Sequence, residues 1–458
     1  MSSPLIISIS GVRGIVGESL TPDIATQMSG AFGHHAPPGP ILIAEDGRTS
    51  GALFHQAASA GLCGVGRDVI DIGISPTPTT EYAVIARKAA GAVILTASHN
   101  PIGWNGLKFL GPDGMFVRAN ELEHLVSTWK TGVLWASAQN VTRPTLWYDS
   151  ARAHVDGVAA MSVIDIDRIR RRGLSVVVDT ICGAACNVAP LLLERLGCKG
   201  IYLNGSPTGI FPRSPEPVGD NLGELADVVK KTGADFGCAF DPDGDRLALV
   251  ADGGRLVSEE ITLALAVKQV RLKQPGGPVV INLSTSRMVE DLGIQMGFDV
   301  HRSAVGEINV ADEMARVGAN LGGEGNGGVM LEELHVGRDG FVALALVLDM
   351  LADSGTTLSK EINDLPQYSM HKQKISHPDL ISDAALDATA GLFADGDRDK
   401  RDGVRVEWND RWVQVRASNT EPIVRVFAEA PTASVARSLV DQVTSHIGTA
   451  LGLPLSVS

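Results

Sequence analysis

The sequence predicts an α/β protein built from four consecutive segments, the last of them a smaller α+β unit. Short β-branched runs alternate with helix-type stretches along most of the chain, and the pattern changes to period-two alternation near the C-terminus. Continuous apolar strands between helices are typical of buried, mostly parallel sheets, whose functional loops follow the carboxyl ends of the strands. At roughly 150 residues per domain, the 458 residues suffice for three or four domains.

The expected elements follow from runs of apolar residues and their periods. Strands are expected at 41–44, 68–73, 91–96, 174–179, 236–240, 247–250 and 278–282, and helices at 52–62, 122–129 and 341–351. After about residue 368 we expect a helical stretch, two alternating strands at 403–408 and 412–416, and a closing helix at 433–447. These patterns place the four segments at 1–145, 150–253, 254–367 and 368–458.

Composition excludes several classes of protein. The net charge of −14 argues against nonspecific nucleic-acid binding, which needs a basic surface. No apolar run approaches the ~20 residues of a membrane span, and the N-terminus lacks the basic region of a secretory signal. The five cysteines are scattered and odd in number, which is typical of a reduced cytoplasmic protein and excludes a zinc ribbon or a disulfide scaffold.

The first chemistry-bearing loop is Thr96-Ala-Ser-His-Asn-Pro101, directly after the run 91–95. Pro101 biases the residue before it away from helix, so Ser98 is expected in an irregular loop past the end of a buried strand. A serine there is a phosphate ligand, a nucleophile or an ordinary turn residue. Lys108 is near enough in sequence to return to this loop. Without that context, a solvated lysine is the simpler interpretation.

The second loop, Asp241-Pro-Asp-Gly-Asp-Arg246, lies between two apolar runs. Three carboxylates at alternate positions repel one another in a low-dielectric pocket unless a cation neutralises them. Oxygen ligands alone favour Mg²⁺ over Ca²⁺ or Mn²⁺. An EF-hand beginning at Asp241 would need glycine at its sixth position and glutamate at its twelfth, where the chain has Arg246 and Asp252. The remaining alternative is a solvated acidic turn.

The third loop is Gly322-Gly-Glu-Gly-Asn-Gly-Gly328. It matches the dinucleotide pattern G-x-G-x-x-G only formally, because no glycine-packed crossover helix follows. Glu324 and Asn326, set among glycines, are better explained as hydrogen-bonding arms for hydroxyl or amino groups. A flexible hairpin is the alternative.

The fourth loop, Arg416-Ala-Ser-Asn-Thr-Glu-Pro422, follows the expected strand at 412–416. The arginine offers a bidentate fork, and Ser418, Asn419 and Thr420 add neutral donors, so the loop is typical of a phosphate clamp. Arg425 lies on the next expected strand and either contributes to the clamp or is an exposed strand arginine.

These four loops, in this order, resemble the α-D-phosphohexomutase family of phosphoglucomutases, phosphomannomutases and phosphoglucosamine mutases. The opening Ser8-Ile-Ser-Gly-Val-Arg-Gly-Ile-Val-Gly17 also looks like the first segment of that family, which supplies an arginine, here Arg13. The resemblance covers nearly the whole chain. It implies four domains around a central cleft: three related α/β domains with mixed sheets and a C-terminal α+β domain.

The resemblance also implies roles. Ser98 would be a phosphoserine, and its phosphate would hold one Mg²⁺ together with Asp241, Asp243 and Asp245. Lys108 and His99 would transfer protons, Arg13 would steady the phosphoryl group, and Arg246 would bind beside the metal loop. Sugar and distal phosphate would be bound by Glu324, Asn326, Arg416, Ser418, Asn419 and Thr420. A hexose 1,6-bisphosphate would be intermediate and activator, and the enzyme would be a cytoplasmic monomer or homodimer whose partners are small sugar phosphates.

Departures from the family bear on the substrate. Many bacterial members have a sugar loop of the Gly-Glu-Met-Ser-Gly-His type, whereas here Asn326 replaces the serine and Gly328 the histidine. Glu307 stands where some glucose and mannose enzymes have histidine. An added carboxylate favours a protonated 2-amino group, so glucosamine phosphate is the expected substrate, with a phosphomannomutase or phosphoglucomutase as the alternative.

Two other classes remain open. A sugar-phosphate phosphatase or kinase would use Asp241 as nucleophile and Asp243 as acid and base, and a sensor would bind sugar phosphate without chemistry. The Ser-His-Asn-Pro loop and the absence of a Walker-type Gly-Lys-Ser/Thr sequence favour the mutase over a phosphatase or kinase. A sensor would not need to keep both a serine in that position and the three aspartates.

Overall fold

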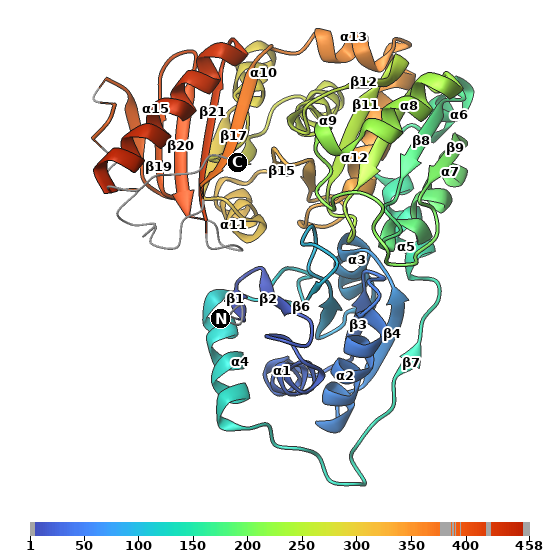
Figure 1. Cartoon of the computed structure of the whole chain (residues 1–458). Coiled ribbons are helices and arrows are strands. Elements are labelled where there is room, and N and C mark those ends of the chain that lie inside the picture. The colour runs from blue at the N-terminus through green and yellow to red at the C-terminus, as the bar shows by residue number, and fades with distance from the viewer. Residues whose placement is uncertain are drawn as a thin grey trace.

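A computed structural model describes residues 5–375, 386, 389, 391–393, 395–417 and 423–451. Four separate sheets follow one another along the chain, each with helices packed against it (Figure 1). The predicted fold class, three α/β domains with mixed sheets and a C-terminal α+β domain, is therefore confirmed. We number these domains I to IV.

Domain I contains strands β1 (Ile6–Ser8), β2 (Gly11–Ile15), β3 (Ile41–Glu45), β4 (Val69–Ile74), β5 (Gly91–Leu95), β6 (Trp104–Leu110) and β7 (Thr145–Leu146), and helices α1 (Pro22–His35), α2 (Gly51–Gly64), α3 (Thr77–Arg87) and α4 (Ala119–Thr131). Its strand order is β1-β2-β6-β5-β3-β4-β7. The central strands β3 and β5 are fully or almost fully buried, as expected for continuous apolar runs covered by helices on both faces.

Domain II contains α5 (Ser150–Ala160), α6 (Ile166–Arg172), β8 (Ser175–Asp179), α7 (Ala189–Leu196), β9 (Lys199–Leu203), α8 (Gly223–Thr232), β10 (Phe236–Phe240), β11 (Leu247–Ala251) and β12 (Arg255–Leu256). Domain III contains α9 (Glu260–Lys273), β13 (Val279–Asn282), α10 (Met288–Met296), β14 (Val300–Ser303), α11 (Glu307–Val317), β15 (Leu321–Glu324), β16 (Gly328–Leu331), α12 (Gly340–Ser354) and α13 (Leu358–Asn363).

One topology recurs in the first three domains. In each, four strands lie in the order second, first, third, fourth: β4-β3-β5-β6, β9-β8-β10-β11 and β14-β13-β15-β16. The first three strands are parallel and the fourth runs antiparallel to the third. The loop between the third and fourth strand therefore has the same structural position in all three domains, at the carboxyl end of a parallel strand.

Domain IV contains β17 (Ser369–Ile375), β18 (Asp397–Asp399), β19 (Val404–Glu407), β20 (Trp412–Ala417), β21 (Val424–Ala430) and α15 (Ala433–Leu451). Its sheet is antiparallel throughout, in the order β17-β21-β20-β19-β18. The helical stretch expected between about 368 and the strand at 403 lies mostly outside the described residues, and residues 386 and 389, which are described, are helical. Directly after 368, however, residues 369–375 form a strand that pairs along its whole length with β21. Its Met, Gln and Lys residues favour helix, but tertiary pairing overrides that weak preference.

The domains differ in how their cores connect. A single cluster of buried apolar side chains extends from domain II into domain III, and the rings of Phe240 and Phe341 stack within it at 4.7 Å between centroids. Domain IV has a core of its own between its sheet and α15. Helix α12 is the element that both middle domains cover, which explains why its residues 340–351 are all buried.

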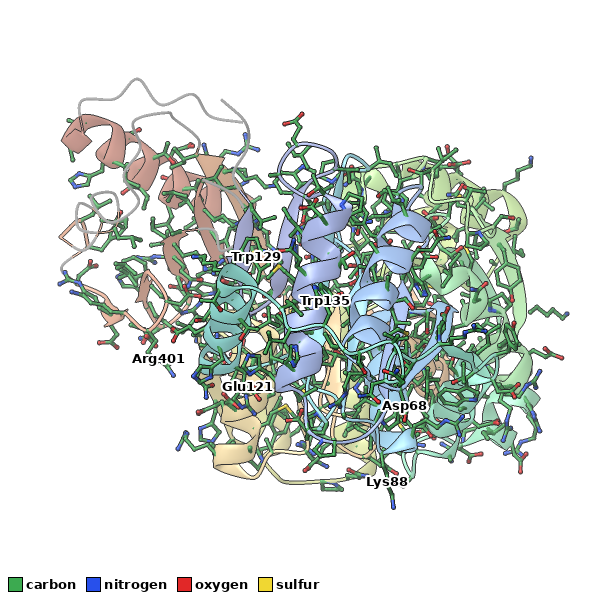
Figure 2. The ribbon with its side chains drawn as sticks, turned by 90° about the horizontal axis from the view of Figure 1, so that it is seen from below. Asp68, Lys88, Glu121, Trp129, Trp135 and Arg401 are labelled. Atoms are coloured by element: carbon green, nitrogen blue, oxygen red, sulfur yellow. The ribbon has the colours of Figure 1, made fainter. Side chains whose placement is uncertain are left out.

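The segment between α4 and α5 runs over the outside of domain I, and most of its residues are exposed. Seen from below, Trp135 lies against α1 and α2 (Figure 2), where Gly30 and Gly64 leave room for its ring. In the part of the chain that the structure describes, no helix is long and apolar enough to cross a membrane.

Candidate active site

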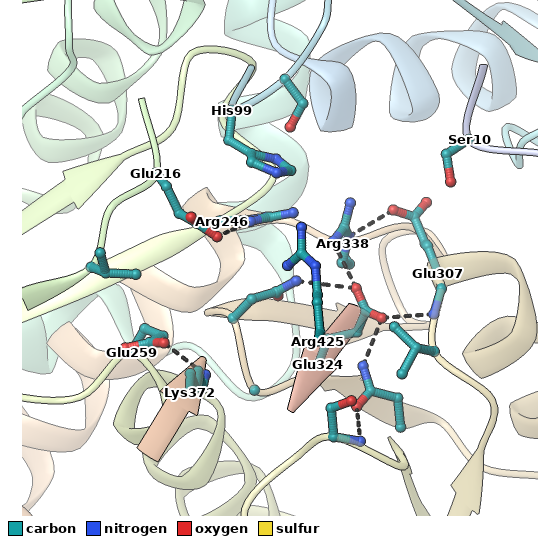
Figure 3. A pocket seen from close by; sticks show the side chains of 18 of the residues that line it. Ser10, His99, Glu216, Arg246, Glu259, Glu307, Glu324, Arg338, Lys372 and Arg425 are labelled. Carbon is teal, nitrogen blue, oxygen red and sulfur yellow. Dashed lines mark hydrogen bonds and ion pairs between the residues drawn. The ribbon is translucent and has the colours of Figure 1, made fainter. Parts of the chain in front are cut away.

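A cavity of about 490 Å³ lies at the centre of the molecule and is lined by all four domains. Its walls include His99 from domain I, Arg246 from domain II, Glu324 from domain III and Arg425 from domain IV (Figure 3). The three recurrent loops between third and fourth strands all reach this space, which is why residues from distant parts of the sequence meet there.

Ser98 lies three residues past the end of β5 and is 2% exposed. Its backbone φ of 48° is in the left-handed region that non-glycine residues seldom adopt. The amide of Ser98 donates to Thr96 Oγ1 at 2.8 Å, and its hydroxyl donates to Asp241 Oδ2 at 3.1 Å. The serine loop of domain I and the aspartate loop of domain II are thus in direct contact.

Arg48 holds the serine loop in this shape. Its guanidinium donates to the backbone carbonyls of Ser98, Asn100, Pro101 and Trp104, and its Nε lies 2.9 Å from Asp46 Oδ2. Sequence reasoning missed this arginine. A signal exists, since Asp46-Gly-Arg48 directly follows β3, at the same sheet edge as the serine loop.

The three aspartates of the second loop are each 0% exposed, and one carboxylate oxygen from each lies within 4.8 Å of the others. Asp243 Oδ2 accepts hydrogen bonds from Lys108 Nζ at 2.6 Å and from Thr77 Oγ1 at 2.9 Å. Oδ1 of Asp243 and Oδ1 of Asp245 accept no hydrogen bond from the described residues. The set could hold a divalent cation through oxygen ligands.

Lys108 is not a solvated lysine. It lies in β6, opposite Ile94 of β5, and its side chain is 2% exposed. Burial alone would lower its pKa, but Asp243 and Asp245 raise it above the ordinary value. Burial and the two neighbouring carboxylates raise the pKa of Asp241, whereas Lys108 holds the pKa of Asp243 below its ordinary value against the effect of burial.

Three more predicted residues surround the serine. Arg13, in β2, donates from Nη1 to Asn100 Oδ1 at 2.9 Å, and burial lowers its pKa to about 10. His99 lines the cavity, and burial followed by the nearby Arg246 holds its pKa well below the ordinary value. Arg246 Nη1 lies 3.8 Å from Glu216 Oε1, and its Nε lies 3.7 Å from Asp245 Oδ1.

The glycine-rich loop of domain III is a tight β-hairpin in which Glu324 pairs with Gly328. Glu324 Oε1 accepts from Asn282 Nδ2 at 2.7 Å and from Gly306 N at 3.0 Å. The other oxygen, Oε2, accepts from Arg338 Nη1 at 2.7 Å and from Asn326 Nδ2 at 3.3 Å. Both predicted arms therefore lie in the hairpin and line the cavity.

Arg338 is the second residue that sequence reasoning missed. Its guanidinium lies between Glu324 and Glu307, with Glu307 Oε2 at 2.9 Å (Figure 3). It also contacts Asp245 Oδ2 at 2.6 Å, so it joins the aspartate loop to the glycine-rich loop. Glu307 begins α11, lines the cavity and is 4% exposed, and its Oε1 accepts no hydrogen bond from the described residues. Burial is the largest effect that raises the pKa of Glu307.

Arg416 is the member of the fourth loop that the structure describes. It lines the cavity from β20, and its Nε donates to Asp402 Oδ2 at 3.1 Å. Arg425, at the start of β21, lines the same cavity rather than the outer surface. Ser418, Asn419 and Thr420 lie outside the described residues.

Comparison with known sequences matches this chain to a single protein family along its length. Models of the phosphoglucomutase/phosphomannomutase family match four consecutive stretches: alpha/beta/alpha domain I at 6–132, domain II at 152–254, domain III at 258–368 and the C-terminal domain at 374–446. A phosphoglucomutase/phosphomannomutase of Thermococcus kodakarensis is 35% identical, over 94% of this chain and 96% of the relative. A probable phosphoglucosamine mutase of Methanothermobacter thermautotrophicus is 33% identical, over 98% and 99%.

Solved structures agree with the sequence relatives. A phosphoglucomutase/phosphomannomutase family protein from Burkholderia thailandensis superposes with a TM-score of 0.85 at 27% identity, covering 99% of this chain and 100% of its own. A putative phosphomannomutase from Thermus thermophilus gives a TM-score of 0.83 at 25% identity, with coverages of 97% and 99%. The likeness extends over all four domains.

Proposed function

The chain belongs to the phosphoglucomutase/phosphomannomutase family of intramolecular phosphotransferases, and on this premise we propose that it interconverts hexose 1-phosphates and 6-phosphates through a phosphoserine at Ser98. One observation carries the proposal: the Ser98 hydroxyl lies 3.1 Å from Asp241 at the wall of a cavity that all four domains share. Phosphoryl transfer needs alignment and positive charge around three equatorial oxygens, and this cavity supplies both.

In the proposed reaction the phosphoryl group leaves Ser98 for a free hydroxyl of the bound sugar phosphate. The bond from phosphorus to Ser98 Oγ breaks, a bond to the sugar oxygen forms, and the hydroxyl proton passes to the enzyme while Oγ regains one. Lys108 and His99 line the cavity beside Ser98 and are the groups proposed for these transfers. The bisphosphate then reorients in the cavity so that its other phosphate faces Ser98. The reverse step transfers that phosphate to Ser98.

The aspartate loop fits the hard cation expected for this chemistry. Asp241, Asp243 and Asp245 offer only oxygen ligands, and two of their oxygens accept no hydrogen bond from the described residues. We assign one Mg²⁺ to these carboxylates and the Ser98 phosphate. When bound, the ion polarises the phosphoryl group and stabilises the departing serine oxygen.

The remaining residues bind different parts of the substrate. Arg13, hydrogen-bonded to Asn100 of the serine loop, and Arg246 supply positive charge at the reacting phosphate. Glu324 and Asn326 bind sugar hydroxyls, and Arg416 binds the phosphate that does not react, with Ser418, Asn419 and Thr420 as its neighbours in the sequence. With one phosphate site at each end of the sugar, the bisphosphate can bind in either orientation, as the isomerisation requires.

The substrate we propose is glucosamine phosphate. Glu307 places a buried carboxylate on the cavity wall, with Oε2 held by Arg338 and Oε1 accepting nothing from the described residues. A protonated 2-amino group would donate to Oε1 in a charge-assisted hydrogen bond, which a 2-hydroxyl makes more weakly. Relatives named as probable phosphoglucosamine mutases support this choice.

The phosphoserine is tested by mass. After incubation with a hexose 1,6-bisphosphate, the protein should gain about 80 Da, the mass of one phosphoryl group, and Ser98→Ala should show neither the gain nor turnover. Ser29→Ala is the matched control, since Ser29 is buried in α1 of the same domain. Normal turnover by Ser98→Ala would refute the mechanism.

Sugar choice is tested by competition. Glucosamine, glucose and mannose phosphates are compared by kcat/KM, and the glucosamine preference should fall roughly tenfold in Glu307→Gln, because an ionic hydrogen bond becomes a neutral one. Glu313→Gln is the control, since Glu313 lies on the same helix but pairs with Arg316 away from the cavity. An unaltered sugar preference in Glu307→Gln would exclude this role.

A further inference from the structure

Asp402 is an acidic residue beside the cavity to which the reaction above gives no role. It lies between β18 and β19, and its side chain is 18% exposed. A single oxygen, Oδ2, accepts two hydrogen bonds from different domains: from Arg416 Nε of domain IV at 3.1 Å and from the Val305 amide of domain III at 3.0 Å.

The turn that Asp402 contacts belongs to the sugar side of the cavity. Val305 and Gly306 precede Glu307, and the Gly306 amide donates to Glu324 Oε1 at 3.0 Å. The turn therefore presents two consecutive amides to two carboxylates: Val305 to Asp402 and Gly306 to Glu324. A movement of the Asp402 carboxylate displaces the turn that holds Glu324.

The arginine that Asp402 contacts belongs to the phosphate side. Asp402 accepts a hydrogen bond from Nε of Arg416. Nη2 of the same guanidinium is buried and has no hydrogen-bond partner among the described residues. A planar guanidinium fixed at one nitrogen has its remaining donors fixed in direction. The donors left over are those available to a phosphate in the cavity.

The backbone around Asp402 is itself fixed. Gln414 of β20 donates to the Asp402 carbonyl at 3.0 Å and accepts from Ser284 Oγ of domain III at 2.7 Å. Gly403 follows with φ of +70°, and a side chain there would meet the Val415 carbonyl at 2.1 Å. The carboxylate is thus carried on a turn that has little freedom to move.

We propose that Asp402 is a positioning residue that orients Arg416 toward the non-reacting phosphate and couples this phosphate site to the turn supporting the sugar-binding glutamate. The inference rests on the proposed role of Arg416 as phosphate ligand. Asp402 acts through its two partners and has no contact with the reacting phosphoryl group.

The test is a double-mutant cycle of Asp402→Asn and Arg416→Ala with the full chain. Asp402→Asn should raise KM for the hexose phosphate roughly tenfold and weaken competitive inhibition by inorganic phosphate to a similar extent, because one charge-assisted hydrogen bond is lost. The kcat should stay within about twofold, since the serine and aspartate loops are untouched. In the Arg416→Ala background, Asp402→Asn should raise KM by much less than tenfold, because only its contact with the Val305 amide is left to lose.

Asp399→Asn is the matched control. Asp399 ends β18 of the same hairpin and pairs with Arg401. The control should leave KM and phosphate inhibition unchanged, with the thermal midpoints of both variants measured alongside. If Asp402→Asn does not fold, Asp402→Glu replaces it, which keeps the charge but displaces the carboxylate, and should raise KM at least threefold.

The outcomes separate the inference from the proposed function. If Arg416→Ala leaves KM unchanged, the assignment of Arg416 as the phosphate ligand is wrong. If Arg416→Ala raises KM but Asp402→Asn does not, or if the two effects multiply in the double variant, only the positioning role of Asp402 is overturned.

Discussion

Ser98 combines burial, a left-handed backbone and a hydroxyl aimed at an aspartate. A non-glycine residue in this conformation costs about 1 kcal/mol or more, so the surrounding contacts must hold it. Arg48 does so from one side through four carbonyls, and Thr96 from the other through the Ser98 amide. The serine is therefore oriented before any substrate binds.

A half-buried acid, Glu45 at the end of β3, makes stability depend on pH. Burial raises its pKa from 4.5 to about 7, although the nearby His55 acts in the opposite direction. Between these two values the folded state binds the proton more tightly than the unfolded chain, so the free energy of unfolding falls as pH rises from about 4.5 to 7 and levels off above.

Glu45→Gln, which stays neutral, should therefore be more stable than the parent at pH 8 and about equal to it at pH 4. Urea denaturation at both pH values measures the difference. Glu123→Gln, an exposed position on α4 of the same domain, should show no such pH-dependent gain. A Glu45→Gln variant with the pH dependence of the parent would contradict the assignment.

Single residues show what sequence can and cannot reveal. Ser98 and Asp241 were predicted because their residue types stand directly after apolar strands, a local pattern. Arg48 and Arg338 were missed because their importance lies in partners far along the chain: carbonyls about 50 residues away for Arg48, and Asp245, 93 residues distant, for Arg338. A lone arginine carries no sequence signal for such long-range contacts.

Among the elements, the hairpin between the third and fourth strand recurs with three different chemistries. Domain I places a serine there, domain II three aspartates and domain III a glutamate. The strands were predictable from their apolar runs. For the glycine-rich loop a hairpin was only the alternative to hydrogen-bonding arms, because its period-two signal spans only four residues on each side, and the structure shows both together. β17 was missed for a related reason, since an edge strand with polar residues resembles a helix in sequence.

Helix α12 is fixed at its start by Asp339. Oδ1 accepts from the Phe341 and Val342 amides, and Oδ2 accepts from His154 Nε2 at 2.8 Å and His335 Nε2 at 3.1 Å. His154 lies on α5 of domain II, and its other ring nitrogen lies 2.8 Å from Thr79 of domain I. The N-cap of one helix therefore joins three domains.

Asp339→Asn keeps a capping oxygen but loses the charge that both imidazoles contact. The free energy of unfolding should fall by roughly 2–4 kcal/mol, as for two buried hydrogen bonds to a charged group, measured as a shift of the urea midpoint. Asp353→Asn, on the same helix in a partly exposed pair with Arg168, should change it by less than about 1 kcal/mol. Equal shifts for the two variants would contradict the joining role.

At the scale of the whole molecule, the residue patterns predicted four consecutive segments, and the family resemblance correctly implied that four domains surround a cleft. The three-fold recurrence of one topology could not be read from the residues, because strand order is set by the handedness and packing of the crossovers rather than by repeated sequence. Only the assembled structure shows that the cavity is formed by equivalent loops.

The continuous core of domains II and III means that four domains form fewer than four melting units. A molecule whose C-terminal sheet has come loose would still hold the three aspartates and Glu324 in their native relation, because Phe240 and Phe341 stack across the boundary between domains II and III. Heat should then abolish turnover before it separates the aspartate loop from Glu324, and cooling should restore turnover once the C-terminal sheet packs back.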